Sequence, residues 1–224
     1  MTHGTSHARI PLPTASLPTA PHPRRPMTQH ADAELADRLL RTIELDVLPL
    51  TEAGVAAGNK VFGAALLDRQ SLRTVLAETN AELSSPLRHG EMHLLERYHA
   101  LPANARPAPE RLLFLSTHEP CSLCLSAITW SGFDNFFYLF SHADSRDEFA
   151  IPHDLRILRE VFGREDYRRE NAFWRARGIR EMVAGLDDSR RAALGERIGT
   201  IETRYRALSE RYQRTKADNA IPLR

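Results

Sequence analysis

The sequence predicts an α/β protein whose sheet is covered by helices on both faces. Runs with the apolar character of strands occupy residues 61–67, 73–77, 111–116 and 134–140, and helical patterns or turns lie between them. The last two runs are apolar without alternation, which is typical of strands buried on both faces. Because strands alternate with helices along the chain, we expect helices on both sides of one sheet.

Helices and one hairpin turn are predicted for the segments next to these strands. A helix begins at Ala31, and residues 68–72 join the first two strands as a hairpin turn. A second helix covers residues 90–101 and ends before Pro102. A third opens at Pro120, because proline favours the first helical position. The first helix has an apolar stripe for packing on the sheet, formed by Leu35, Leu39, Leu40, Ile43 and Val47.

The chain divides into three expected segments. Residues 1–30 contain six prolines, four histidines and no acid, a composition that predicts a disordered tail. Residues 31–150 form the domain with the strands, and residues 151–224 form a helical extension packed on that domain or on a partner subunit. The extension has a seam of apolar side chains spaced three and four residues apart, namely Leu194, Ile198, Ile201, Tyr205, Leu208 and Tyr212.

Charge and cysteine content narrow the class of protein. The chain has 30 basic and 29 acidic residues, a net charge of +1, so nothing in the total requires a nucleic acid or a membrane as partner. Two cysteines in 224 residues make no disulfide framework and indicate a metal or redox site in a reducing compartment. No apolar run follows Arg24-Arg25, which favours a cytoplasmic protein over a secreted one, although an organellar transit peptide fits the acid-free tail.

Two short motifs contain the residue types of a metal site. His89-Gly90-Glu91 is followed, further along the chain, by Pro120-Cys121-Ser122-Leu123-Cys124. Cysteines three residues apart at a helix start share one face, and the helix start favours thiolates. With His89 they make three ligands and leave the fourth position of Zn²⁺ to water, as in catalytic sites. Glu91 can then move protons beside that water. A redox pair or a structural zinc knuckle is the alternative.

Zinc deaminases share the two metal motifs. Several stretches of this sequence, the two motifs among them, match a single superfamily. They are Phe62-Gly63-Ala64, Asn80, His89-Gly90-Glu91, Glu119-Pro120-Cys121-Ser122-Leu123-Cys124 and Ala127-Ile128-Thr129-Trp130. In these stretches the chain resembles the cytidine deaminase-like superfamily, above all its branch of guanine deaminases and tRNA adenosine deaminases. The resemblance implies a three-layer α/β/α sandwich around a five-stranded mixed sheet, with one Zn²⁺ per subunit. It also implies a homo-oligomer, most often a homodimer.

The resemblance assigns roles to single residues. Glu91 is the general acid and base, and the zinc ligands are His89, Cys121 and Cys124. Asn80, Glu119 and Trp130 match residues on the substrate side in relatives, although Asn80 could equally cap a turn and Trp130 could belong to the core. Gly90 stands where alanine is usual and leaves its backbone N–H available to a substrate.

Lys60 is a further candidate for the pocket. It is one of only two lysines and lies beside a strand expected at the active site. It could contact an anionic group of the substrate, or it could be an ordinary solvated side chain.

We therefore expect a zinc-dependent hydrolase that deaminates a small aminated heterocycle. The substrate would be a nucleobase or nucleoside of the cytosine or guanine type, as for CMP/dCMP-type deaminases. Zinc hydroxide would attack the amino-bearing ring carbon, and Glu91 would pass protons to the ring nitrogen and to the departing ammonia. Two alternatives stay open: a tRNA adenosine deaminase, and a non-catalytic zinc-stabilised module that acts through its arginine-rich C-terminal helices.

Overall fold

The computed structural model describes residues 29–223. The tail expected over residues 1–30 lies outside the described residues, except for Gln29 and His30, which begin the first helix. The helices are α1 (Gln29–Thr42), α2 (Leu48–Ala57), α3 (Gly90–Ala100), α4 (Ser122–Trp130), α5 (His142–Asp147), α6 (His153–Phe162), α7 (Ile179–Ala184) and α8 (Asp188–Thr215). Shorter helical segments are the π-helix η1 (Ile43–Val47) and the 3-10 turns η2 (Pro109–Arg111) and η3 (Lys216–Asp218).

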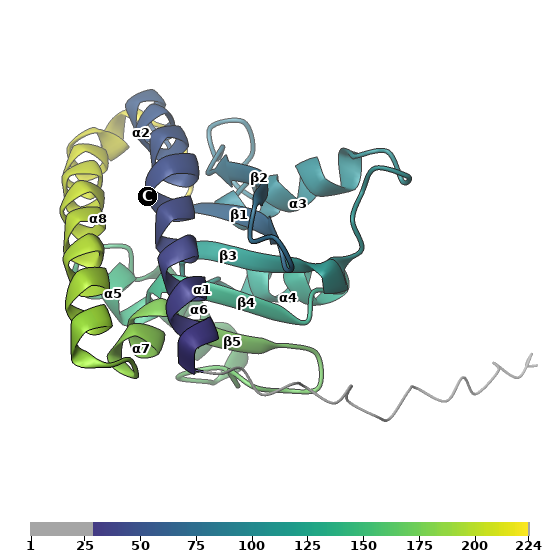
Figure 1. Ribbon diagram of the computed structural model, residues 1–224. Coiled ribbons are helices and arrows are strands. Elements are labelled where there is room, and N and C mark those ends of the chain that lie inside the picture. The colour runs from purple at the N-terminus through teal and green to yellow at the C-terminus, as the bar shows by residue number, and fades with distance from the viewer. Residues whose placement is uncertain (1–28, 224) are drawn as a thin grey trace, which may run out of the picture.

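A five-stranded mixed sheet forms the centre of the molecule, as the sequence predicts (Figure 1). Its strand order is β2-β1-β3-β4-β5. β1 pairs antiparallel with both β2 and β3, whereas β3, β4 and β5 run parallel. The strands are β1 (Gly63–Asp68), β2 (Thr74–Thr79), β3 (Leu112–His118), β4 (Asn135–Phe140) and β5 (Arg175–Gly178).

Helices cover both faces of this sheet, and the alternation of side chains along the strands divides the core in two (Figure 1). Ala65 and Leu67 of β1 face one cluster, while Ala64 and Leu66 face the other. The first cluster contains apolar residues of α1, α2, α7 and α8, and the second contains those of α3 and α4. The chain is therefore a three-layer α/β/α sandwich, which confirms the predicted fold class.

The hairpin turn between β1 and β2 is stabilised by Asp68. One of its carboxylate oxygens accepts hydrogen bonds from the backbone N–H and the hydroxyl of Ser71, at 2.8 Å each. Leu72, which closes the turn, has a positive φ of 56°. The turn predicted at residues 68–72 thus forms through side-chain bonds to the backbone.

The helix predicted from Ala31 is longer than expected. Its predicted stripe is fully buried, but the helix continues through η1 into α2 and ends at Gly58, whose φ of 107° allows a left-handed cap. The seam of α8 is also buried, and all six of its residues belong to the core of the same chain. Ion pairs flank it, such as Arg197 with Glu44 at 3.0 Å.

The fifth strand lies where a helical extension was expected. β5 belongs to residues 151–224, so the sheet spans both predicted segments, 31–150 and 151–224. Its sequence of Arg175, Ala176, Arg177 and Gly178 has none of the apolar pattern that marks the other strands. Among residues 29–223, no helix combines the length and the apolarity that crossing a bilayer requires.

Candidate active site

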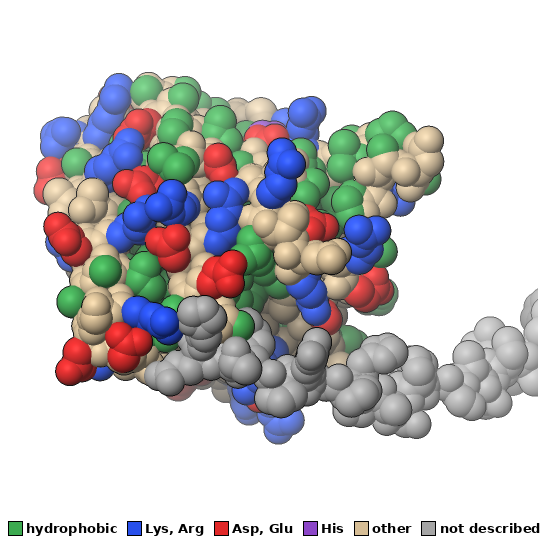
Figure 2. All heavy atoms as spheres, in the orientation of Figure 1, with side chains coloured by type: hydrophobic (Ala, Val, Ile, Leu, Met, Phe, Trp, Pro, Cys, Tyr) green, Lys and Arg blue, Asp and Glu red, His purple; other side chains and the backbone are tan. Residues whose placement is uncertain are grey.

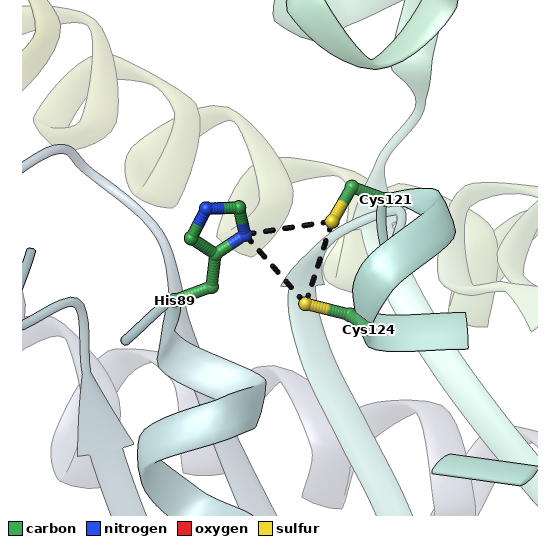
Figure 3. A group of neighbouring side chains, drawn as sticks. All are labelled: His89, Cys121 and Cys124. Atoms are coloured by element: carbon green, nitrogen blue, oxygen red, sulfur yellow. Dashed lines mark hydrogen bonds between the residues drawn. The ribbon is translucent and has the colours of Figure 1, made fainter. Parts of the chain in front are cut away.

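Two helix starts bring His89, Cys121 and Cys124 together (Figure 3). His89 is the N-cap of α3 and Cys121 is the N-cap of α4, while Cys124 lies in the first turn of α4. The Nδ1 atom of His89 lies 3.4 Å from the Sγ of Cys121 and 3.7 Å from that of Cys124, and the two sulfurs are 3.5 Å apart. Within the described residues this is the only such group of potential metal ligands.

These distances fit a tetrahedral zinc ion. Zn–S bonds of about 2.3 Å and a Zn–N bond of about 2.0–2.1 Å set the ligand atoms about 3.5–3.8 Å apart. The imidazole and the two thiols are also the donor types that zinc prefers. Cys121 and Cys124 lie at the start of α4, where the helix dipole favours a thiolate over a thiol. The three predicted ligands could therefore hold Zn²⁺.

The ligands already influence one another electrostatically. Hydrogen bonds from Cys124 and from His89 hold the pKa of Cys121 well below its usual value, despite burial. Burial alone would lower the pKa of His89, but the hydrogen bond and the charge of Cys121 raise it to about 9. A thiolate at Cys121 is thus favoured by its neighbours, which is the state that binds a metal.

Glu91, in α3, lies beside the two cysteines and is only 5% exposed. Its Oε1 accepts a hydrogen bond from the hydroxyl of Ser116 in β3 at 2.8 Å, and its Oε2 lies 3.4 Å from the Sγ of Cys124. Burial, followed by the charge of Cys121, raises the pKa of Glu91. A buried carboxyl beside the metal ligands can accept and release a proton during a reaction.

Asn80 and Gly90 bond to each other. The Oδ1 of Asn80 accepts the backbone N–H of Gly90 at 2.5 Å, and its Nδ2 donates to Glu82 at 2.8 Å. The N–H of Gly90 is therefore not available to a substrate, contrary to the prediction. Asn80 fixes the start of α3, and its predicted contact with substrate stays a prediction.

Glu119 and Trp130 do not line the pocket beside the metal ligands. The buried carboxylate of Glu119 accepts bonds from the hydroxyl of Tyr167 at 2.7 Å and from the backbone N–H of His142 at 2.9 Å. Trp130 is 91% exposed at the far end of α4, about 13 Å along the helix from Cys121. Within one chain, neither side chain supports the predicted contact with substrate.

A pocket of about 250 Å³ opens beside the metal ligands. Its lining is largely apolar and also includes polar residues that the sequence motifs do not connect with the site. Asp154, in the first turn of α6, is the clearest example: burial and the charge of Cys121 raise its pKa to about 7. The lining comprises Lys60, Phe62, Glu82, Pro86, Leu87, His89, Cys121, Ser122, Leu123, Ile151, His153, Asp154, Ile157, Ile221, Pro222 and Leu223.

Lys60 is neither solvated nor free. It is buried and paired with Glu82, Nζ to Oε1, at 2.8 Å. A larger hollow of about 330 Å³ lies elsewhere, at the β5 edge. This hollow is open, and its lining includes Arg169 and Arg175, which pair with acidic residues. None of the potential metal ligands lines it.

Comparison with known proteins finds likeness in structure. No protein-family model and no curated protein matches this sequence. Among solved structures, guanine deaminase from Nitrosomonas europaea is 22% identical, with a TM-score of 0.46 over 83% of this chain and 100% of that one. Guanine deaminase from Bacillus subtilis is 23% identical, with a TM-score of 0.45 over 60% and 80%. A structure from work on tRNA:A34 deaminases is 20% identical, with a TM-score of 0.36 over 42% and 72%.

The sheet order and the arrangement of the three potential ligands are observed in the structure of this chain and do not depend on the comparison. In its motifs the chain resembles the cytidine deaminase-like superfamily.

Proposed function

We propose that this protein is a zinc-dependent hydrolase that removes an amino group from a small aminated heterocycle. The observation on which the proposal rests is the convergence of His89, Cys121 and Cys124, with the buried carboxyl of Glu91 against them. A redox pair or a structural zinc knuckle has no use for such a carboxyl. Three ligands also leave zinc one open position, as hydrolytic zinc sites do.

The reaction needs a water to be activated and protons to be moved. The ligands His89, Cys121 and Cys124 would hold Zn²⁺, which when bound lowers the pKa of a water molecule toward about 7. Glu91 accepts a proton from the attacking water and passes protons to the ring nitrogen and to the leaving amine. The ring carbon gains an oxygen, its C–N bond breaks, and ammonia leaves. Ser116 holds Glu91 in place through these transfers.

The pocket supports a small substrate. Its volume of about 250 Å³ lies below the range of about 300–1,000 Å³ for drug-sized ligands. Phe62 and Leu123 offer apolar surfaces to a flat ring, and Asp154 can accept hydrogen bonds from N–H groups at its edge. A free base, or a base with a small substituent, fits these walls.

The face of the molecule formed by α1, α2 and α8 gives no support to an RNA substrate. Figure 2 shows basic and acidic side chains interspersed over the face formed by α1, α2 and α8. Ion pairs account for this mixture, for instance Arg204 with Glu52 and Arg41 with Asp37. Phosphate binding along RNA favours a continuous basic surface, which this face does not have.

The test is the release of ammonia by the purified full chain. Zinc content is measured first, and then ammonia is assayed with a panel of free bases, nucleosides and tRNA. Glu91→Gln removes the proton carrier, so it should retain zinc and lose at least 99% of the rate, in keeping with the 10²–10⁴-fold contribution of general acid–base groups. Glu96→Gln on the same helix, where Glu96 pairs with Arg88, is the matched control and should match the parent.

The outcomes separate the alternatives. Absence of zinc in the parent, or an unchanged rate in Glu91→Gln, would contradict the proposal. Ammonia released from tRNA and from no free base or nucleoside would favour the tRNA deaminase. Bound zinc without turnover of any amine would favour the non-catalytic module.

Two further expectations remain predictions. The homodimer comes from the resemblance, and the cytoplasmic location comes from the two cysteines, which indicate a reducing compartment. The oligomeric state can be measured by light scattering during size-exclusion chromatography.

A further inference from the structure

A buried ion pair lies at the wall of the pocket. Lys60 is 5% exposed and Glu82 is 3% exposed, and their charged atoms are 2.8 Å apart. Burying two charges costs free energy that their attraction only partly returns, so such pairs are poor candidates for simple stabilisation. This pair is therefore worth examining for a role in the neighbouring site.

The ring of His89 connects the pair to the metal ligands. Its Nδ1 faces the two cysteines, and its other nitrogen points away from them (Figure 3). That second atom, Nε2, lies 3.8 Å from the Oε1 of Glu82. The same Oε1 accepts the hydrogen bond from Lys60.

Glu82 is held from its other oxygen as well. The Nδ2 of Asn80 donates to Oε2, and the Oδ1 of Asn80 accepts the N–H of Gly90, the residue after His89. The carboxylate is thus linked to the start of α3 by two routes, one through the side chain of His89 and one through the backbone. Both routes lead to the start of α3, where His89 is the N-cap.

We infer that Glu82 is the positioning carboxylate of the metal site, with Asn80 holding it in place and Lys60 offsetting its charge. A carboxylate at Nε2 keeps the proton on that nitrogen and leaves Nδ1 as the metal ligand. Lys60 balances the charge of Glu82, so that the carboxylate adds no unpaired negative charge beside two thiolates. The inference rests on the proposed zinc site and assigns roles to the residues around its ligand His89.

Zinc affinity tests this inference without using enzyme activity. The dissociation constant is measured on the full chain by competition with a chromophoric chelator. Glu82→Gln keeps the shape of the side chain and removes its charge, and we expect zinc binding to weaken about 10- to 100-fold, the usual effect of losing such a partner. Lys60→Met leaves the carboxylate beside His89, so its zinc affinity should stay within threefold of the parent while its melting temperature falls.

A second glutamate–histidine pair supplies the matched control. Glu78 of β2 lies 3.4 Å from the Nδ1 of His93 in α3, on a histidine outside the group of metal ligands. Glu78→Gln should therefore bind zinc as the parent does. If Glu82→Gln does not fold, the double variant Lys60→Met with Glu82→Gln removes both charges together, leaves no unpaired buried charge, and should show the same 10- to 100-fold loss.

The inference fails if the folded Glu82→Gln variant, or the double variant, binds zinc as tightly as the parent. It also fails if Lys60→Met loses as much affinity as Glu82→Gln, because the pair would then act only through the stability of the fold. If the parent itself binds no zinc, the proposed function fails with it.

Discussion

The hydroxyl of Ser116, in the central strand β3, donates a hydrogen bond of 2.8 Å to Oε1 of Glu91. Both groups are buried, so this bond fixes the carboxylate on the side of the cysteines without competition from bulk water. The other oxygen, Oε2, is left to face Cys124.

Replacing this hydroxyl should slow the reaction and leave the metal in place. Hydrogen bonds to charged groups contribute about 1.5–3 kcal/mol, so Ser116→Ala should lower kcat about 10- to 100-fold. Zinc content should equal that of the parent. Ser126→Ala, which removes a hydroxyl bonded to its own helix, is the control and should not change kcat. A Ser116→Ala enzyme with the parent's kcat would show that Glu91 needs no such support.

Gly90 packs directly on the backbone of β1. A Cβ atom at this position would lie 2.7 Å from the Cα of Gly63, closer than real Cβ contacts come. Gly90→Ala should therefore destabilise the protein by about 1–3 kcal/mol, as overpacking does. In α8, Gly195 has open space around its Cα, so Gly195→Ala should instead stabilise it by about 0.5–1 kcal/mol. Urea unfolding at fixed zinc concentration measures both, and a Gly90→Ala protein as stable as the parent would contradict the packing.

The glycine in His-Gly-Glu is thus explained by the neighbouring strand and not by the substrate. Its N–H is taken by Asn80 and its Cα lies against Gly63.

His118 should make the fold sensitive to acid. Its ring stacks on Phe140 at 4.7 Å, and burial, followed by the charge of Arg180, holds its pKa well below 6.5. The unfolded chain binds this proton more readily than the folded one, so stability is complete above about pH 6.5 and falls as the pH drops below it. The slope contributed by one such group is at most about 1.4 kcal/mol per pH unit.

His118→Phe tests this sensitivity, because it keeps a ring and removes the titrating group. Unfolding free energies are compared between pH 7 and pH 5. Since both proteins have the same metal ligands, the difference between their two curves reports His118 alone. The variant should lose less stability on acidification than the parent, and parallel curves would refute the assignment.

Asp154 should affect substrate binding and not the metal. Asp154→Asn keeps the size of the side chain and weakens its ability to accept bonds from substrate N–H groups, so kcat/KM should fall about 10- to 100-fold with normal zinc content. Asp147→Asn is the control, because Asp147 lies on the surface and pairs with Arg146. An unchanged kcat/KM would place the substrate elsewhere in the pocket.

The sequence predicts the group of potential metal ligands and most of the sheet, because both are marked by short motifs or apolar runs, each within a single segment. Cys121 and Cys124 share one helical turn, and β3 and β4 are continuous apolar runs. β5 was missed because a short edge strand with two arginines has no apolar pattern to detect.

The pocket could not be predicted in the same way. Lys60, Glu82 and Asp154 come from separate segments and meet only through tertiary packing. The sequence predicts that the N–H of Gly90 is available, because it does not reveal that Asn80 lies within hydrogen-bond distance. Likewise, the sequence does not reveal that Lys60 is buried. Its burial depends on the ion pair with Glu82, and no motif connects these two residues.

The central claim is that the group of His89, Cys121 and Cys124 holds the metal on which deamination depends. The most direct measurement strips the protein of metal and adds zinc back in steps while ammonia release is followed with a substrate found in the panel. We expect no release without zinc and a rate that rises linearly until one zinc is bound per chain. In Cys124→Ser we expect neither the rise in rate nor the binding of one zinc per chain. Ammonia release by the metal-free protein, or a rate independent of zinc occupancy, would contradict the central claim.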